Sequence, residues 1–141
     1  MTPIRRSVYG LSVSAFAALL TGCSIDTLIW GGDGAQVIQT TEKLVSDLAS
    51  GETSDIVCTD SVADLGTPSD WSGLSAGEPE KFKPEYWDDQ VALDPQWSIN
   101  LEGLPGDAVS GIRYPGDVFY RETDEGLCMI DVAWSTLVSV N

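Results

Sequence analysis

The chain has 141 residues, of which 22 are acidic and 7 basic, and its formal net charge is −15. Nucleic-acid binding is not expected, because it depends on Lys and Arg that neutralise phosphates. The absence of His excludes Ser-His-Asp and Cys-His catalysis within the chain, and also a histidine-based metal site. We predict no catalytic residue, no metal site and no cofactor.

The first segment has the parts of a secretory signal. Two basic residues, Arg5 and Arg6, precede an apolar run of 13 residues from Val8 to Leu20, and small residues follow. A membrane-spanning helix needs about 20 apolar residues. The run is therefore too short for a permanent span, and we expect export and cleavage instead.

The residues Leu20-Thr21-Gly22-Cys23 close this segment and resemble the lipobox of bacterial lipoproteins. The resemblance implies cleavage before Cys23, a lipid on Cys23, and attachment to the extracytoplasmic side of the cell membrane. An ordinary cleaved signal, in which Cys23 plays no part, is the alternative. Three regions follow from the lipoprotein interpretation: a signal peptide (1–22), a lipidated tether (23–34) and a single folded domain (35–141).

The tether and the charge of the mature chain bear on how the domain would be held. Cleavage would remove Arg5 and Arg6 and make the net charge −17, so the lipid rather than a basic surface must provide the anchor. The glycine-rich residues 31–34 are expected to break regular structure. The tether also contains four apolar residues, which we expect to pack on the domain rather than to touch lipid headgroups. They are Ile25, Leu28, Ile29 and Trp30.

The clearest predicted element is an amphipathic helix over residues 35–50. Its apolar residues recur at helical spacing, and polar residues occupy the other face. The apolar positions are Val37, Ile38, Thr41, Leu44, Val45 and Leu48. Asp33 is a candidate cap at its start and Gly51 a stop signal at its end. One apolar face requires a sheet or other helices to cover it.

The middle of the chain is predicted to be poor in regular structure. Residues 54–65 form either a strand or a short helix, because a short apolar run does not separate the two. Residues 66–83 are rich in Gly, Pro, Ser and acids and are expected to form a loop. Trp71, Leu74 and Phe82 are the expected anchors of that loop on the core. Residues 84–89 suit one helical turn that begins at a proline.

The last third is predicted to be β-structure. Residues 97–102 alternate apolar and polar side chains, as in a half-buried strand. Residues 109–114 predict a weaker strand. Two further strands, 117–122 and 127–138, flank the turn-forming residues 123–126 as a hairpin. Because successive side chains of a strand point to opposite faces, Cys128 is predicted to share one face with the residues that alternate with it. These are Ile130, Val132, Trp134 and Val138, and they are expected to point inward.

The chain has three cysteines, and a lipid on Cys23 would leave Cys58 and Cys128 as a pair. We predict a disulfide between them, because the compartment outside the cytosol permits one. Two buried free thiols or a metal pair are the alternatives. Zinc usually requires four closely spaced ligands, and the chain has no Cys-x-x-Cys.

One helix followed by a loop-rich middle and an antiparallel sheet predicts the α+β class, with about four strands. The element order over residues 35–140 is similar to that of NTF2-like and cystatin-like domains, which wrap a curved sheet around an N-terminal helix. That resemblance implies a concavity able to bind a ligand. The candidates to line it, which would otherwise be core residues, are Trp97, Ile99, Tyr120 and Trp134.

Three further groups of residues are candidates for chemistry. Asp88-Asp89 with Asp94, or Asp124-Glu125, could hold Ca²⁺, but neither matches the pattern of a calcium loop, so solvated charge is the preferred interpretation. An aromatic set could stack on a sugar or grip a partner, and packing on the core is preferred for it. Its members are Trp71, Tyr86 and Trp87.

The leading functional hypothesis is a membrane-anchored lipoprotein domain that binds an envelope protein or a small ligand, without enzymatic activity. One alternative is a cell-envelope hydrolase that uses a pair of carboxylates, at least one with a raised pKa. The other is a prophage-type lipoprotein that blocks superinfection.

Overall fold

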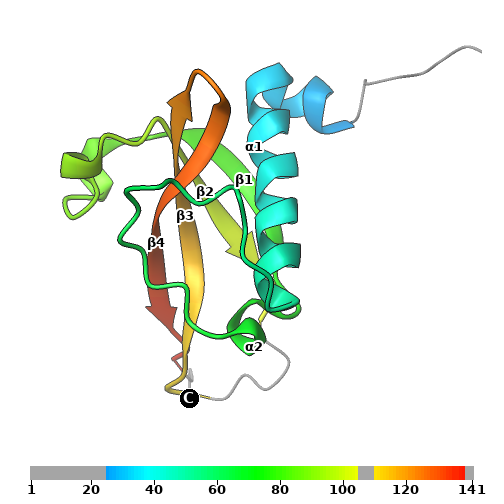
Figure 1. Ribbon diagram of the computed structural model, residues 1–141, viewed down its shortest axis with the longest axis vertical. Coiled ribbons are helices and arrows are strands. Elements are labelled where there is room, and N and C mark those ends of the chain that lie inside the picture. Colours follow the sequence, from blue (N-terminus) through cyan, green and yellow to red (C-terminus); the bar gives the residue numbers. More distant parts are fainter. Residues whose placement is uncertain (1–24, 105–109, 139–141) are drawn as a thin grey trace, which may run out of the picture.

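The computed structural model describes residues 25–104 and 110–138. The helices are α1 (Ile25–Ala49) and the short α2 (Pro68–Trp71). The strands are β1 (Ser75–Lys81), β2 (Trp97–Glu102), β3 (Arg113–Thr123) and β4 (Gly126–Thr136). They form one antiparallel sheet in chain order (Figure 1). The predicted α+β class is therefore confirmed.

Helix α1 begins at Ile25, earlier than the predicted start at residue 35. Gly31 interrupts it with a φ of 75°, and the first turn bends away from the axis of the longer part (Figure 1). Glycine adopts this conformation without the steric penalty of a side chain. The predicted break in regular structure is confined to Gly31, because residues on both sides of it are helical. Residues 23 and 24 of the predicted tether lie outside the described residues.

The end of α1 agrees with the predicted stop at Gly51. Gly51 has a φ of 74°, its N–H donates to the carbonyl of Leu48, and the N–H of Glu52 donates to the carbonyl of Asp47. These two bonds form a Schellman motif, which satisfies carbonyls that the helix leaves without partners. Gly51 therefore ends the helix by its backbone geometry.

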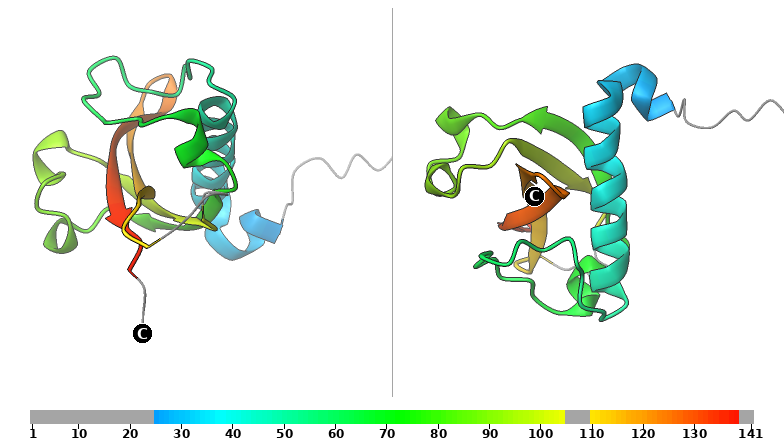
Figure 2. Two further views of the ribbon diagram at one scale, coloured as in Figure 1. Left: turned by 90° about the horizontal axis from the view of Figure 1, so that it is seen from below. Right: turned by 45° about the horizontal axis from the view of Figure 1, so that its top comes forward.

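The longer part of α1 packs against one face of the sheet (Figure 2). Val37 and Leu44 have no exposed surface, and they belong to the same cluster as Ile99 of β2 and Val118 of β3. Burial of such side chains contributes about 1.5–3 kcal/mol each. The predicted helical stripe therefore forms the inner core of the domain.

The first strand, β1, was not predicted, because residues 66–83 were expected to form a loop. Its sequence has little apolar character, and within it only Pro79 is buried. β1 lies at the edge of the sheet, where a proline removes no required hydrogen-bond donor. The expected anchors are confirmed nonetheless: Trp71 and Leu74 are buried in the inner core, and Phe82 packs on a second cluster.

Strand β3 replaces the two strands that were predicted on either side of residues 115–116. The pairing with β4 shifts between Pro115 and Asp117, so that Gly116 forms a bulge within a single strand. A Cβ at Gly116 would lie 2.5 Å from the Ser135 Oγ, so a side chain at this position would have to displace the Ser135 hydroxyl. The strand begins at Arg113, and Val109 lies outside the described residues.

The predicted faces of β4 are correct for Val132 and Trp134 but wrong for Cys128, Met129 and Ile130, because of a second bulge. Phe119 pairs with Asp131 and Tyr120 with Met129, so Ile130 has no partner on β3. The bulge reverses the alternation. Met129 and Val132 pack in the inner core, whereas Cys128 and Ile130 join an outer cluster on the other face.

The outer cluster covers part of the face opposite α1. Phe119 and Ile130 are its fully buried members, and Cys58 joins them from the segment after α1. The connection between β1 and β2 contributes Phe82 and Trp87, and it projects away from α1 (Figure 2). It contains the 3-10 turns η1 (Pro84–Tyr86), which confirms the predicted single turn, and η2 (Val91–Leu93).

Residues 54–65 form neither of the predicted alternatives. Most of the segment has no regular structure, and Val57 makes one isolated parallel bridge to Met129 on β4. The N–H of Cys58 donates to the Met129 carbonyl, and the Met129 N–H donates to the Ile56 carbonyl. The segment therefore covers a short part of the free edge of β4.

Candidate functional site

A polar cavity of about 210 Å³ lies on the outer face of the sheet, beside the outer cluster. Glu80 of β1 pairs with Ser98 of β2, and Asn100 of β2 pairs with Asp117 of β3. Directly paired residues point to the same face, and so do residues two apart on one strand. Three adjacent strands thus bring their polar side chains together. The lining residues are Glu78, Glu80, Trp87, Ser98, Asn100 and Asp117.

Ser98 is the most unusual residue of this cavity. Its residue surface is 6% exposed, and its hydroxyl makes no hydrogen bond to any residue of 25–104 or 110–138. The other buried polar residues of that part of the chain all have partners: Thr41 bonds Tyr120, Ser54 bonds Asp47, and Gln90 bonds Asp131. No side-chain nitrogen or oxygen atom of the described residues is both fully buried and without a partner, so the Ser98 hydroxyl itself is open to the cavity. Ser98, the exception among these four buried polar residues, borders the cavity.

The surroundings of the cavity shift the pKa of one carboxylate, that of Asp117. Burial, followed by the nearby charge of Glu80, raises the pKa of Asp117 from its ordinary value to about 6. Among the described residues no cation forms an ion pair with Asp117. Lys83 lies 3.6 Å from Glu80, and both side chains are about half exposed, so this pair is weak. Asp117 therefore has no close counter-charge among the described residues.

Asn100 is fixed by the edge strand. Its Oδ1 accepts a hydrogen bond of 2.8 Å from the N–H of Glu78. A Cβ at Gly77 would lie 2.5 Å from the Asn100 Nδ2, so the amide requires glycine beneath it. The register of β1 and β2 shifts at this point, between Ala76 and Pro79. The bulge and Gly77 together make room for a side-chain amide at the cavity.

Trp87 forms the apolar wall of the cavity. Its ring meets Phe119 edge-on, with centroids 4.8 Å apart, and Phe119 also meets Phe82 at 6.0 Å. The predicted aromatic set does not form one surface. Trp71 is buried and donates its indole N–H to the Leu65 carbonyl, Tyr86 is 71% exposed, and only Trp87 borders this cavity.

The four residues predicted to line a concavity do not line one together. Ile99 and Tyr120 have almost no exposed surface and belong to the inner core, which was the alternative interpretation. Trp97 borders a different cavity, of about 250 Å³, and donates its indole N–H to Glu122. Trp134 is half-buried, bonds the Asp64 carbonyl, and stacks with Arg113. The helix covers the face that was expected to be open.

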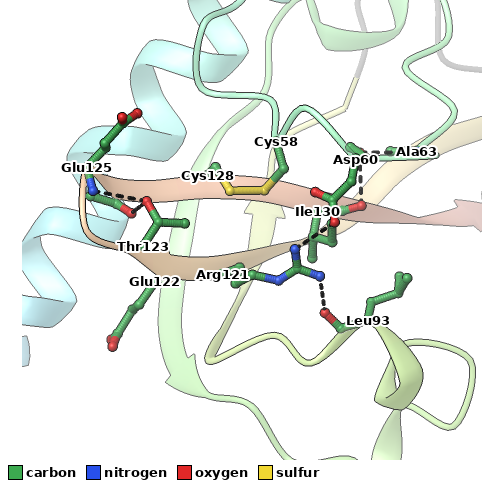
Figure 3. The surroundings of a disulfide bond; sticks show 12 residues. Cys58, Asp60, Ala63, Leu93, Arg121, Glu122, Thr123, Glu125, Cys128 and Ile130 are labelled. Carbon is green, nitrogen blue, oxygen red and sulfur yellow. Dashed lines mark hydrogen bonds and ion pairs between the residues drawn. A yellow bond between two sulfur atoms is a disulfide. The ribbon is translucent and has the colours of Figure 1, made fainter.

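The predicted disulfide between Cys58 and Cys128 is present, with Cα atoms 4.9 Å apart (Figure 3). Arg121 lies close by, where it donates to Asp60 at 2.9 Å and to the Leu93 carbonyl at 2.6 Å. The hydrogen bond from Arg121 lowers the pKa of Asp60. The disulfide and Arg121 together tie two long connections to the hairpin of β3 and β4.

The candidate calcium ligands are not assembled into a site. Asp88, Asp89 and Asp94 lie on the connection between β1 and β2, and Asp124 and Glu125 form the tip of the hairpin. Within 25–104 and 110–138, no group of three or more acidic, Cys or His residues is arranged to hold a metal ion. All five of these acidic residues are exposed.

In comparisons with known proteins, no family model, no curated protein and no solved structure matches the chain. No helix among the described residues is long and apolar enough to cross a membrane. Cys23 and the other residues of the lipobox lie outside the described part of the chain. The site must therefore be interpreted from its own chemistry.

Sequence reasoning missed the polar cavity, although part of its signal is visible. Ser98 and Asn100 were placed on the polar face of their strand, which is correct. Asp117 stood first in a predicted strand, where nothing distinguished it from the other acids. Glu78 and Glu80 are two apart, as on one face of a strand, but they lie in the segment predicted as a loop.

Proposed function

We propose that the protein is a lipid-anchored domain of the cell envelope, attached through Cys23 and used for binding rather than for catalysis. Three features support this proposal: the resemblance of Leu20-Thr21-Gly22-Cys23 to a lipobox, the disulfide between Cys58 and Cys128, and the strongly acidic composition. Disulfides persist mainly in oxidising compartments. Exposure of the domain outside the cytosol accounts for all three features.

The observation that carries the proposal is the first turn of α1. Ile25, Leu28 and Ile29 are 73%, 76% and 63% exposed, so the expectation of packing on the domain is wrong for these three, whereas Trp30 is half-buried. The turn begins two residues after Cys23, and Gly31 bends it away from the rest of the helix. An apolar helical face at a lipid attachment point suits contact with the headgroup region. Apolar side chains buried in the headgroup region would add to the membrane binding that the lipid provides.

Labelled palmitate tests the anchor directly. We expect wild-type protein to incorporate the label and to partition into the membrane fraction, and Cys23→Ala to do neither. Ser24→Ala is the matched control, because it changes the next residue and keeps the thiol. Unlabelled wild-type protein would contradict the anchor.

Replacement of Leu28 and Ile29 by Ser tests the contribution of the apolar turn. The lipidated double variant is expected to leave vesicles more readily than wild type. Val62→Ser, at another exposed apolar residue, is the control. Equal retention of wild type and double variant would remove the apolar turn from the proposal.

We further propose that the domain is of the NTF2-like or cystatin-like type. The helix packed on one face of a four-stranded antiparallel sheet supports this proposal. The concavity implied by that type is filled here by the inner core, so a binding site must lie elsewhere. An experimental structure that places strands in another order would contradict it.

A hydrolase with a carboxylate pair remains a second candidate, because Asp117 and Glu80 border one cavity and the pKa of Asp117 is raised to about 6. A raised pKa suits a general acid. This candidate predicts turnover of chromogenic glycosides, with a loss of at least about 100-fold in Asp117→Asn and in Glu80→Gln. Absence of turnover by wild type would contradict it.

A further inference from the structure

The polar cavity on the outer face has an acidic lining. It places Glu78, Glu80 and Asp117 around one small volume, and within the described part of the chain only Lys83 forms an ion pair with any of them. That pair is half exposed and joins Glu80 alone. Glu78 and Glu80 are exposed and Asp117 is half-buried, yet Glu80 lies close enough for its charge to raise the pKa of Asp117. A cation that enters the cavity would offset the repulsion between Glu80 and Asp117.

Ser98 gives a second and independent indication of a ligand. More than nine tenths of the residue is buried, and its hydroxyl borders the cavity without a hydrogen-bond partner in the described residues. A hydroxyl oxygen accepts hydrogen bonds from donors such as ammonium. The other buried polar residues have side-chain partners within the fold, whereas the Ser98 hydroxyl faces the cavity.

We propose that this cavity binds an alkylammonium group, either of a free primary amine or at the end of a lysine side chain of another protein. An ammonium group has three N–H donors, which suits the carboxylates of Asp117 and Glu80 together with the hydroxyl of Ser98. Trp87 supplies an aromatic wall, and aromatic rings attract such cations. The proposal deepens the binding role proposed above and rests on it.

The size of the cavity agrees with a small group. Its volume of about 210 Å³ is below the range of about 300–1,000 Å³ that is typical of pockets for drug-sized ligands. An alkylammonium end fits such a volume, whereas a large heterocyclic cofactor does not.

Two other ligand classes fit the cavity less well. Ca²⁺ takes six to eight oxygen ligands, and no group of three or more acidic residues among those described is arranged around a metal position. A neutral sugar could stack on Trp87, but it would leave the repulsion between Asp117 and Glu80 uncompensated. A cation satisfies the charge, the hydroxyl and the aromatic ring at once.

The proposal predicts a dependence of binding on pH. The charged groups around Asp117 are Glu78 and Glu80 of β1, together with Lys83 of the connection that follows it; Asp131 of β4 is held by Gln90 beside this cavity. An ammonium ion binds the ionised form of Asp117, whose pKa is about 6. Affinity should therefore rise about tenfold between pH 5 and pH 7.

The test is calorimetric titration of the full chain in detergent with 1,4-diaminobutane at pH 7. The neutral isostere 1,4-butanediol is the ligand control. A second arm uses the peptide Gly-Gly-Lys-Gly-Gly, with norleucine in place of lysine as its control. Tighter binding of the diamine indicates a free amine as the natural ligand, and tighter binding of the peptide indicates a protein lysine.

Three variants connect binding to the cavity. Asp117→Asn should weaken binding at least tenfold, Ser98→Ala about threefold, and Asp124→Asn, at the exposed hairpin tip, should leave it unchanged. Binding by the Cys23→Ala chain would still support the cavity, so the anchor and the cavity can fail separately. The proposal is overturned if neither cation binds at millimolar concentration, or if Asp117→Asn and Asp124→Asn bind alike.

Discussion

The two faces of the sheet are built from the same strands but treat their polar groups differently. On the inner face, the hydroxyl of Tyr120 is fully buried and lies 2.8 Å from the Thr41 hydroxyl, which also donates to the Val37 carbonyl. On the outer face, Ser98 is nearly as buried and has no partner among the described residues. A closed core requires every polar group to be paired. A binding site leaves groups that a ligand can pair.

The titratable groups of the inner and outer faces differ in the same way. Burial raises the pKa of Tyr120, which keeps its phenol neutral and costs the protein nothing at pH 7. Burial also raises the pKa of Asp117 to about 6, so this group is charged at pH 7 at the expense of stability. The inner face is therefore optimised for stability, whereas the outer face stores unfavourable interactions.

The largest expected effect concerns the outer face, where the disulfide closes a long loop. Replacement of both Cys58 and Cys128 by Ser should lower the free energy of unfolding by about 4 kcal/mol. Denaturant titration of the double variant measures this value. An unchanged midpoint would show that the outer cluster needs no covalent support.

On the inner face, Leu44→Ala should cost about 3 kcal/mol, because Leu44 has no exposed surface and its cavity cannot fill with water. Leu104→Ala, at an exposed position, is the matched control and should change the free energy of unfolding by less than about 0.5 kcal/mol. Similar values for both variants would mean that α1 does not pack as described.

The paired hydroxyls test the comparison itself. Thr41→Val should cost about 2 kcal/mol, since it leaves the buried Tyr120 hydroxyl without its partner. Ser98→Ala should change the free energy of unfolding by less than about 0.5 kcal/mol, since no bond is lost. Chemical denaturation of both variants gives the difference. A cost for Ser98→Ala as large as that for Thr41→Val would place Ser98 in the structural core.

The smallest expected effect is a stabilisation. The folded pKa of Asp117, about 6, lies above its unfolded value, so the folded state binds the proton more tightly and stability falls as pH rises from 4 to 7. Asp117→Asn should remove this loss and stabilise the protein at pH 8 by about 1 kcal/mol, after allowance for partial exposure. At pH 4 the two proteins should be equally stable. Thermal melts at both pH values would detect a gain that does not depend on pH, which would contradict the assignment.

Periodicity predicted the inner face well and the outer face poorly. The helical stripe of Val37, Leu44 and Leu48 and the alternation of Trp97 and Ile99 are strong apolar patterns, and both lie where they were expected. The disulfide followed from cysteine counting, independently of geometry. These features could be predicted because they depend on the local apolar pattern or on the number of cysteines.

The misses arose where tertiary context overrides local pattern. β1 has almost no apolar residues and forms because β2 offers it a partner. The bulges at Gly116 and Ile130 change which side chains share a face, and no period-two pattern reveals an inserted residue. The polar cavity needs three strands in register, one of them β1, so it could not be assembled from sequence.

The outer face holds a half-buried carboxylate, that of Asp117, whose charge no ion pair among the described residues compensates. Observation of the Asp117 side-chain carboxyl by carbon-13 NMR during a pH titration, without ligand, tests this most directly. The structure predicts a midpoint at about pH 6. A midpoint near 3.8, the ordinary value for an aspartate, would contradict the account.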